Sequence, residues 1–209
     1  MSGWRRLAVR AGIGLLVLLA LCGCATRLPD SESARSEPPP LPREFRGVWV
    51  ATVANIDWPS RPGLPVAAQR AEMLRVIDTV QRLRLNAIIL QVRPAADAIY
   101  PSALEPWSEY LTGEQGKAPT PACDPLAEWI AETHARGIEL HAWFNPFRAR
   151  HASAKSAPAA THISRNMPDA VKAYGDQLWI DPGDEAAARH SLNVIADVVR
   201  RYDIDGVHV

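Results

Sequence analysis

The sequence has few cysteines, no visible repeat and no net charge, and each of these features argues against a particular class of protein. Its 209 residues include three cysteines, too few for a disulfide scaffold, and no internal repeat is visible. The 23 basic residues are balanced by 23 acidic ones, and this zero net charge argues against a nucleic-acid partner. With 47% apolar residues, the composition is that of a globular protein and excludes wholesale disorder.

Two chemical signatures are also missing. No Gly-rich phosphate loop follows the first predicted strand, which argues against a dinucleotide-binding sheet. His141 and His208 form no His-x-His or His-Glu-x-x-His pattern, so we predict no obligatory metal and no cofactor. Seven tryptophans, in contrast, are many for this length, and they indicate a large core or a surface that stacks flat ligands.

The N-terminus has the order of a bacterial export signal. Arg5, Arg6 and Arg10 precede an apolar run over 11–21 that is too short to span a bilayer as a mature helix. Residues 21–24, Leu-Cys-Gly-Cys, resemble a lipobox, which predicts a lipoprotein signal peptide over 1–23 and acylation of Cys24. A plain secretory signal or an uncleaved anchor are the alternatives.

The predicted lipid anchor has consequences for location. Acyl chains on Cys24 would hold the protein on a membrane, and Ala25 in the next position favours the outer membrane, facing the periplasm. Residues 24–43 read as the lipidated Cys and a Pro/Ser-rich tether that spaces a domain from the lipid surface. The domain then covers residues 44–209.

Strand and helix patterns alternate along this domain. The predicted strands cover 46–53, 86–93, 138–144 and 205–209, with a short extended piece over 178–180. The predicted helices cover 66–85, 124–136 and 184–202. Residues 94–122 and 148–176 read as long loops.

The alternation predicts an α/β fold with a parallel sheet, either an open doubly wound sheet or a (β/α)8 TIM-like barrel. We favour the barrel, with only about the first four βα units present. A whole barrel needs roughly 250 residues, so we expect 44–209 to be the N-terminal half of a larger domain. Alone, this half would expose a strand edge and an unfilled interior.

Polar residues gather where the predicted strands end. Residues on one strand face alternate, so Gln91 and Arg93 share a face, as do Trp143 and Asn145. Barrels place their sites at the carboxyl ends of strands, and these side chains would converge there, with Asn55 and Asp57 nearby. The alternative is that each is a satisfied polar residue near a loop.

Six segments in this order carry a family resemblance. They are Arg46-Gly47-Val48-Trp49-Val50-Ala51-Thr52-Val53-Ala54-Asn55-Ile56-Asp57-Trp58-Pro59, Gln91-Val92-Arg93-Pro94 with Asp97 and Tyr100, Pro106-Trp107-Ser108 with Leu111-Thr112-Gly113, His141-Ala142-Trp143-Phe144-Asn145-Pro146-Phe147-Arg148, Trp179-Ile180-Asp181-Pro182-Gly183, and Tyr202-Asp203-Ile204-Asp205-Gly206-Val207-His208. Together they resemble the glycosyl hydrolase-like 10 family of bacterial envelope lipoproteins. The resemblance implies a TIM-like barrel and glycosidase chemistry, with peptidoglycan glycan strands as a substrate of some members.

The resemblance stops before the expected catalytic acids. In the family, the segment that matches 205–208 runs on into an aromatic residue and an Asp-Asp-Tyr stretch, and Val209 stands at the aromatic position. Glycoside cleavage commonly uses two carboxyl groups. We therefore expect the main catalytic residues beyond Val209, with Asp57, Asp97 and Asp181 as weak candidates.

The other site residues are expected to bind substrate. Arg93 and Gln91 would suit an acidic or acetamido-bearing sugar, although Arg93 could instead pair with Asp97. Of four tryptophans that could stack on sugars, we expect two to touch ligand, and the two histidines could be buried or could hold a catalytic Asp. The predicted binding set is Trp49, Asn55, Trp58, Gln91, Arg93, Tyr100, Trp107, His141, Trp143, Asn145, Arg148 and His208.

The leading hypothesis is an envelope-anchored glycoside hydrolase that acts on a polysaccharide, with peptidoglycan glycan as the substrate class. The alternative is a non-catalytic glycan-binding barrel that keeps the aromatic and amide groups but lacks the acids. A metal-dependent polysaccharide deacetylase is a third possibility, and the missing His-rich pattern argues against it. The expected partners are the polysaccharide and a membrane, without nucleic acid.

Overall fold

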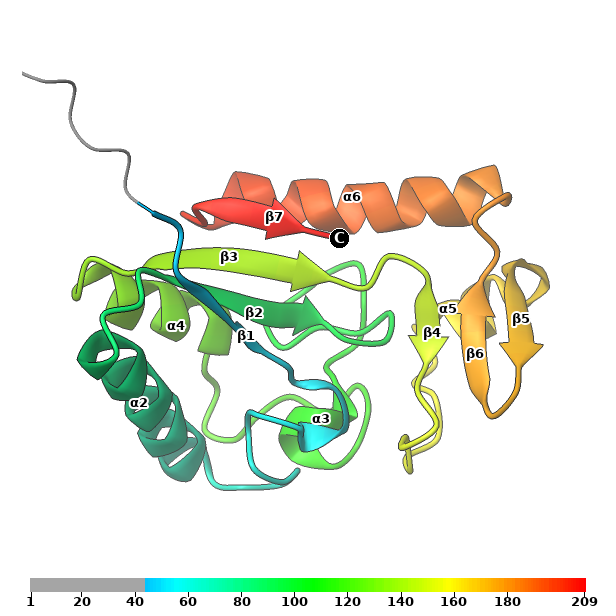
Figure 1. Ribbon diagram of the computed structural model, residues 1–209. Helices are drawn as coiled ribbons and strands as arrows, with labels where there is room; N and C mark the ends of the chain where they lie inside the picture. Colours follow the sequence, from blue (N-terminus) through cyan, green and yellow to red (C-terminus); the bar gives the residue numbers. More distant parts are fainter. Residues whose placement is uncertain (1–43) are drawn as a thin grey trace, which may run out of the picture. The chain divides into compact units, whose positions relative to one another are not determined.

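Four parallel strands form the main sheet of the protein, which the computed structural model describes over residues 44–209. The predicted signal peptide, Cys24 and the tether lie outside the described residues. In spatial order the strands are β1 (Gly47–Val50), β2 (Ala87–Arg93), β3 (Glu139–Phe144) and β7 (Gly206–His208) (Figure 1). The parallel α/β sheet predicted from the sequence is therefore confirmed.

Three long helices connect these strands. They are α2 (Val66–Arg82), α4 (Pro125–His134) and α6 (Glu185–Arg201). Residues from all three join the sheet in one buried cluster. The strands follow one another across the sheet in sequence order, and their helices cover one face, as in a singly wound sheet. A doubly wound sheet has helices on both faces. The singly wound arrangement is that of one wall of a barrel.

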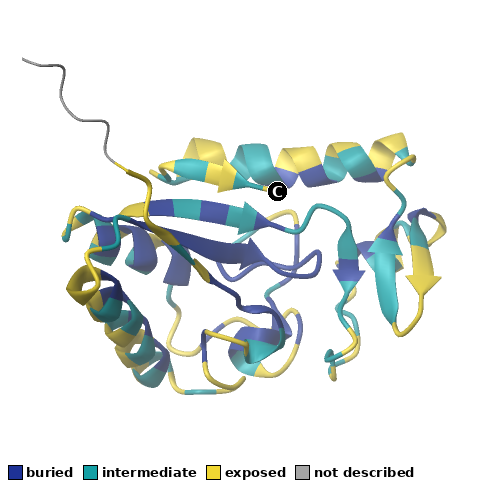
Figure 2. Cartoon of the chain, in the orientation of Figure 1, coloured by how far each residue is buried: buried dark blue, intermediate teal, exposed yellow. Residues whose placement is uncertain are grey.

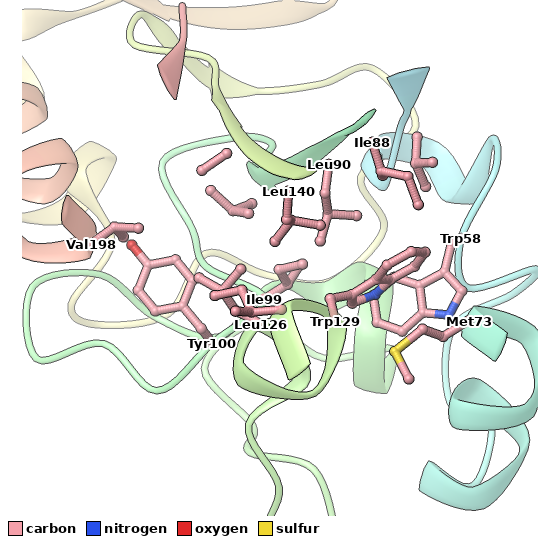
Figure 3. Packing of buried hydrophobic residues seen from close by; sticks show 14 of the residues in the cluster. Trp58, Met73, Ile88, Leu90, Ile99, Tyr100, Leu126, Trp129, Leu140 and Val198 are labelled. Atoms are coloured by element: carbon pink, nitrogen blue, oxygen red, sulfur yellow. The ribbon is translucent and has the colours of Figure 1, made fainter. Parts of the chain in front are cut away.

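The core lies between the helices and the sheet. β2 is buried along its whole length, while the outer sides of α2 and α6 are exposed (Figure 2). Trp58 and Trp129 meet edge to face at 5.5 Å, beside Met73 and below Ile88 and Leu90 of the central strand (Figure 3). This apolar packing supplies most of the driving force for folding and fixes the sheet that positions the site.

Local sequence signals explain where the helices begin and end. Asp124 caps α4 by accepting a hydrogen bond from the Ala127 amide at 3.1 Å, and Pro125 occupies the first helical position. Asp184 caps α6 in the same way through the Ala187 amide at 2.9 Å. No helix within residues 44–209 combines the length and apolar character needed to cross a bilayer.

The first predicted strand is longer than the observed one. β1 ends at Val50 rather than at residue 53, and the chain then forms the short 3-10 helix η1 (Val53–Asn55). Ala54 and Asn55 both have a φ of 55°, a left-handed conformation that no strand can continue. The loop over 94–122 contains one short helix, α3 (Glu109–Thr112).

The prediction that residues 148–176 form a loop was wrong. This region and the extended piece after it build a three-stranded antiparallel sheet with two short helical turns. The elements are β4 (Arg148–Arg150), α5 (Ile163–Asn166), η2 (Pro168–Ala170), β5 (Val171–Tyr174) and β6 (Gln177–Ile180), and the strand order is β4-β6-β5. A second apolar cluster that includes Ala96 and Ala187 holds this sheet. We call it the side sheet; its first strand begins just after the carboxyl end of β3 (Figure 1).

Candidate functional site

The face of the main sheet opposite the helices carries a cluster of rings. The burial pattern of β3 confirms the predicted alternation, with Leu140 buried against the helices and Trp143 on the other side. Trp49 meets Trp143 edge to face at 4.8 Å and His208 at 5.2 Å, and 51% of Trp49 is exposed. We call the surface formed by Trp49, His141, Trp143 and His208 the open face.

The two histidines of the open face are linked to each other. Nδ1 of His141 lies 3.2 Å from Nε2 of His208, and Nε2 of His141 lies 3.0 Å from a Glu139 oxygen. Both hydrogen bonds form when Nε2 of His141 donates to Glu139 and Nδ1 of His141 accepts from His208. Burial and the neighbouring His141 lower the pKa of His208, which favours the neutral His208 ring in this pair of hydrogen bonds. The structure thus brings together the two histidines that the sequence placed on neighbouring strands.

Gly206 permits this close packing. A Cβ atom there would lie against Nδ1 of His141 and only 2.7 Å from its Cε1. We expect Gly206→Ala to lower the free energy of unfolding by about 1–3 kcal/mol, because overpacking forces the ring off its position. Denaturant unfolding measures the loss. The double variant with His141→Ala should recover most of it, and a single variant as stable as wild type would contradict this reading.

A pocket of about 310 Å³ opens among the loops that follow the strands. Asn55 comes from the loop after β1, Glu109 and Tyr110 come from α3 after β2, and Ser153 and Lys155 follow β4. Ligands of parallel α/β folds bind at the carboxyl ends of strands, so this pocket occupies the position that the fold predicts for a site.

Side-chain hydrogen bonds fix the walls of this pocket. Asn55 Nδ2 donates to the carbonyl oxygens of Pro59 and Tyr110, both at 2.8 Å. The Tyr110 hydroxyl lies 3.1 Å from the Ser153 hydroxyl, and buried Glu109 accepts the Lys155 amide at 2.8 Å. Burial raises the pKa of Tyr110, so its phenol stays neutral and acts through hydrogen bonds. Glu109 and Tyr110 were not predicted, since a polar residue inside a long loop carries no periodic signal.

Arg93 is not placed to touch a ligand. Its side chain is fully buried and forms a two-pronged ion pair with Glu105, in which Nε donates at 2.8 Å. Its Nη1 donates to the carbonyl oxygens of Asn145 and Pro146 at 2.6 and 3.1 Å. The partner of Arg93 is thus Glu105 rather than Asp97, and the pair ties the loops after β2 and β3 together.

Gln91 has a comparable structural role. Its Oε1 accepts the backbone amides of Thr52 and Val53 at 3.0 and 2.8 Å, so it holds the turn that follows β1. Asn145 Nδ2 likewise donates to the Pro94 carbonyl at 3.3 Å. Gln91 and Asn145 thus hold the backbone in place at the carboxyl end of the sheet.

The remaining predicted binding residues divide by burial. Trp58 and Tyr100 belong to the core, and Trp58 donates its indole N–H to the Gln69 carbonyl at 3.0 Å. Trp107 is partly buried against the same core. Trp49 is exposed, and Trp143, which contacts it on the open face, is intermediate in burial, as Trp107 is.

The three weak catalytic candidates each hold local backbone. Asp57 accepts the Ala51 amide at 2.8 Å and Asp181 accepts the Gly183 amide at 2.9 Å. Asp97 is buried, and burial raises its pKa to about 7 against the hydrogen bonds that it accepts. In the part of the chain that the structure describes, no group of three His, Cys, Asp or Glu side chains could hold a metal ion.

The geometry defines an α/β protein with an aromatic open face opposite its helices and a loop pocket at the carboxyl ends of its parallel strands. The chain belongs to the glycosyl hydrolase-like 10 family, whose family model matches residues 44–209.

Two curated relatives are named as glycosyl hydrolases. The chain is 46% identical over 199 residues to glycosyl hydrolase YngK of Bacillus subtilis, with 94% of this chain and 38% of YngK covered. It is 33% identical over 229 residues to glycosyl hydrolase DigH of Escherichia coli K12, with 97% of this chain and 51% of DigH covered. The chain thus spans about half the length, or less, of these curated relatives. Among solved structures, the α-galactosidase TtGalA of Thermus thermophilus is similar with a TM-score of 0.47 and 14% identity, over 79% of this chain and 30% of that one.

Proposed function

We propose that the protein is a glycoside hydrolase of the cell envelope that acts on a polysaccharide, with peptidoglycan glycan strands as its substrate. The observation that carries this proposal is the perpendicular pair Trp49 and Trp143, near the carboxyl ends of β1 and β3 in a chain of the glycosyl hydrolase-like 10 family. Indole rings offer flat apolar surfaces with a polar N–H, which suits sugar rings that have apolar faces and hydroxyl edges.

The described residues would bind and position the glycan. The open face would stack sugar rings, and the pocket beside Tyr110 would hold polar substituents. Hydrolysis needs a carboxylic acid and a second carboxylate. We place this pair beyond Val209, where the family resemblance continues into an Asp-Asp-Tyr stretch, because Asp57 and Asp181 hold local backbone and Asp97 is buried.

Release of reducing ends from purified glycan strands tests the reaction. The protein as its gene encodes it should release them, and Trp143→Ala should lower kcat/KM roughly 30-fold, equivalent to about 2 kcal/mol of lost binding energy. Leu192→Ala is the matched control, because Leu192 is an exposed apolar residue on α6 and should leave the rate unchanged. Trp143→Ala with wild-type activity would contradict a role for the open face.

A non-catalytic glycan-binding protein is the second candidate. The local backbone roles of Asp57 and Asp181 favour it for the described residues. One result distinguishes the hydrolase from the binding protein. Glycan that the complete protein binds but never cleaves supports binding alone. Sedimentation with peptidoglycan does not separate them, because both functions predict it.

We also propose that Cys24 carries the lipid anchor and that the protein faces the periplasm from the outer membrane. Cys24→Ala should move the protein from the membrane fraction to the soluble periplasmic fraction, since the acyl chains would be lost. Cys22→Ala is the control and should leave it in the membrane. Cell fractionation gives the answer, and unchanged membrane retention of Cys24→Ala would overturn the proposed anchor.

A further inference from the structure

The stretch of chain between β4 and α5 forms one wall of the pocket. We call residues 151–160 the wall loop. They belong to no helix or strand, yet Ser153 and Lys155 of this loop line the pocket. The backbone amides of such a loop need partners from elsewhere in the protein, because an amide that is shielded from water and unpaired costs free energy. The side chains that supply these partners therefore decide where Ser153 and Lys155 lie.

Two buried residues of the segment after β2 hold the wall loop. One carboxylate oxygen of Glu109, Oε2, accepts the amides of Lys155 and Ser156 at 2.8 and 2.9 Å, across 46 and 47 positions of sequence. Oε1 of Gln115 accepts the Ala159 amide at 3.1 Å, and the Gln115 amide donates to the Ser156 hydroxyl at 3.1 Å. The wall loop is thus attached at two places, and Glu109 provides the attachment that lies at the pocket.

The surroundings of Glu109 fit a residue that holds backbone. Only 6% of Glu109 is exposed, and within residues 44–209 its carboxylate is bonded to these two amides rather than to a charged side chain. Hydrogen bonds to an ionised acceptor are roughly twice as strong as neutral ones. Two of them on successive amides fix both the position and the direction of the loop at Lys155.

The side chains of the wall loop are in turn available to a ligand. The Lys155 side chain is exposed at the pocket, and its ammonium group has no ion pair or hydrogen bond within residues 44–209. The Ser153 hydroxyl lies 3.1 Å from the hydroxyl of Tyr110, the residue after Glu109. The short helix α3 therefore holds both pocket-lining residues of the wall loop, Lys155 through its amide and Ser153 through its hydroxyl.

We propose that Glu109 is a positioning residue of the pocket, which holds the wall loop so that Ser153 and Lys155 meet the glycan. Its carboxylate acts through the two loop amides and does not transfer a proton to the substrate. A loop that is fixed before binding avoids the entropic cost of ordering it on binding, so the expected benefit is tighter binding. This inference rests on the proposed function and adds to it the residue that fixes the shape of the pocket.

Two substitutions separate positioning from acid–base catalysis. Glu109→Gln keeps the side-chain length and an oxygen for both amides but loses the charge, whereas Glu109→Asp keeps the charge but draws it back by one methylene. With purified glycan strands and the protein as its gene encodes it, Glu109→Asp should raise KM about tenfold and leave kcat within about twofold. Glu109→Gln should raise KM less than about threefold.

A matched control shows that the loss belongs to this carboxylate. Glu114→Asp makes the same chemical change in an exposed residue of the same segment and should change neither KM nor kcat. A Glu109→Gln protein that is inactive while Glu109→Asp is active would make Glu109 a catalytic acid and would overturn the positioning role. Wild-type kinetics in both variants would overturn it as well.

Hydrogen–deuterium exchange without glycan measures the attachment directly. In Glu109→Asp the amides of Lys155 and Ser156 should exchange at least about tenfold faster than in wild type, while the Ala159 amide, held by Gln115, should change less than about twofold. Unchanged exchange at residues 155 and 156, or equally faster exchange throughout the main sheet, would overturn the positioning role and leave the proposed function intact. A wild-type protein that neither binds nor cleaves glycan would overturn both.

Discussion

Replacing Glu105 with glutamine is expected to lower the free energy of unfolding by about 3–5 kcal/mol. The substitution keeps the shape of the side chain but leaves the fully buried Arg93 guanidinium without its counter-charge. The carbonyl oxygens of Asn145 and Pro146 remain as acceptors but supply no negative charge. Denaturant unfolding measures the change. Glu132→Gln is the control, because Glu132 of α4 pairs with Arg70 and Arg136 at the protein surface, and we expect it to cost less than about 1 kcal/mol.

The same ion pair predicts a pH dependence. Burial alone would raise the pKa of Glu105, but the Arg93 charge and hydrogen bonds from His190 and Arg93 outweigh it and hold the pKa at about 2. The carboxylate is therefore stabilised in the folded state. Its contribution should be fully present above the ordinary pKa of 4.5 and should be lost as the pH falls toward 2. Glu105→Gln should flatten the stability curve in this range, and an unchanged acid slope would contradict the assignment.

Gln91→Leu should cost about 2–4 kcal/mol of unfolding free energy. The substitution removes the one oxygen that accepts both the Thr52 and the Val53 amides, and each orphaned buried amide costs about 1–3 kcal/mol. Part of this cost is offset, because Nε2 of Gln91 has no partner among the described residues and leucine removes that orphan.

A matched control separates this loss from a general effect of the substitution. Gln81→Leu changes an exposed residue of α2 and should alter the stability by less than about 0.5 kcal/mol. Chemical denaturation of both variants gives the comparison. A Gln91→Leu protein as stable as the control would show that the turn after β1 does not depend on this side chain.

The sequence predicts the main sheet well because its signals are local and periodic. The apolar alternation of β3 and the Asp-Pro start of α4 depend on neighbours within a few residues. The side sheet was missed because its strands are three or four residues long and are stabilised by a cluster that draws on distant Ala96 and Ala187.

The sequence pattern places polar residues at the carboxyl ends of the strands but does not give their roles. Gln91 and Arg93 have the same alternation whether they face a ligand or the protein interior, and only the tertiary fold brings Glu105 to Arg93. Arg148, predicted in the same binding set, has no hydrogen-bond partner for its buried Nε within residues 44–209 and lies over the Trp179 ring instead. Sequence alone does not show which of these two arginines is paired within the protein. The pairing of each depends on loops whose conformation has no periodic signal.

A crystal structure of the protein as its gene encodes it, with a peptidoglycan-derived oligosaccharide bound, tests the central claim most directly. We expect sugar rings to lie against Trp49 and Trp143 at the carboxyl end of the main sheet, with the chain of sugars reaching the pocket beside Tyr110. An oligosaccharide bound on the helix-covered side of the sheet, with both tryptophans free of sugar, would contradict the account.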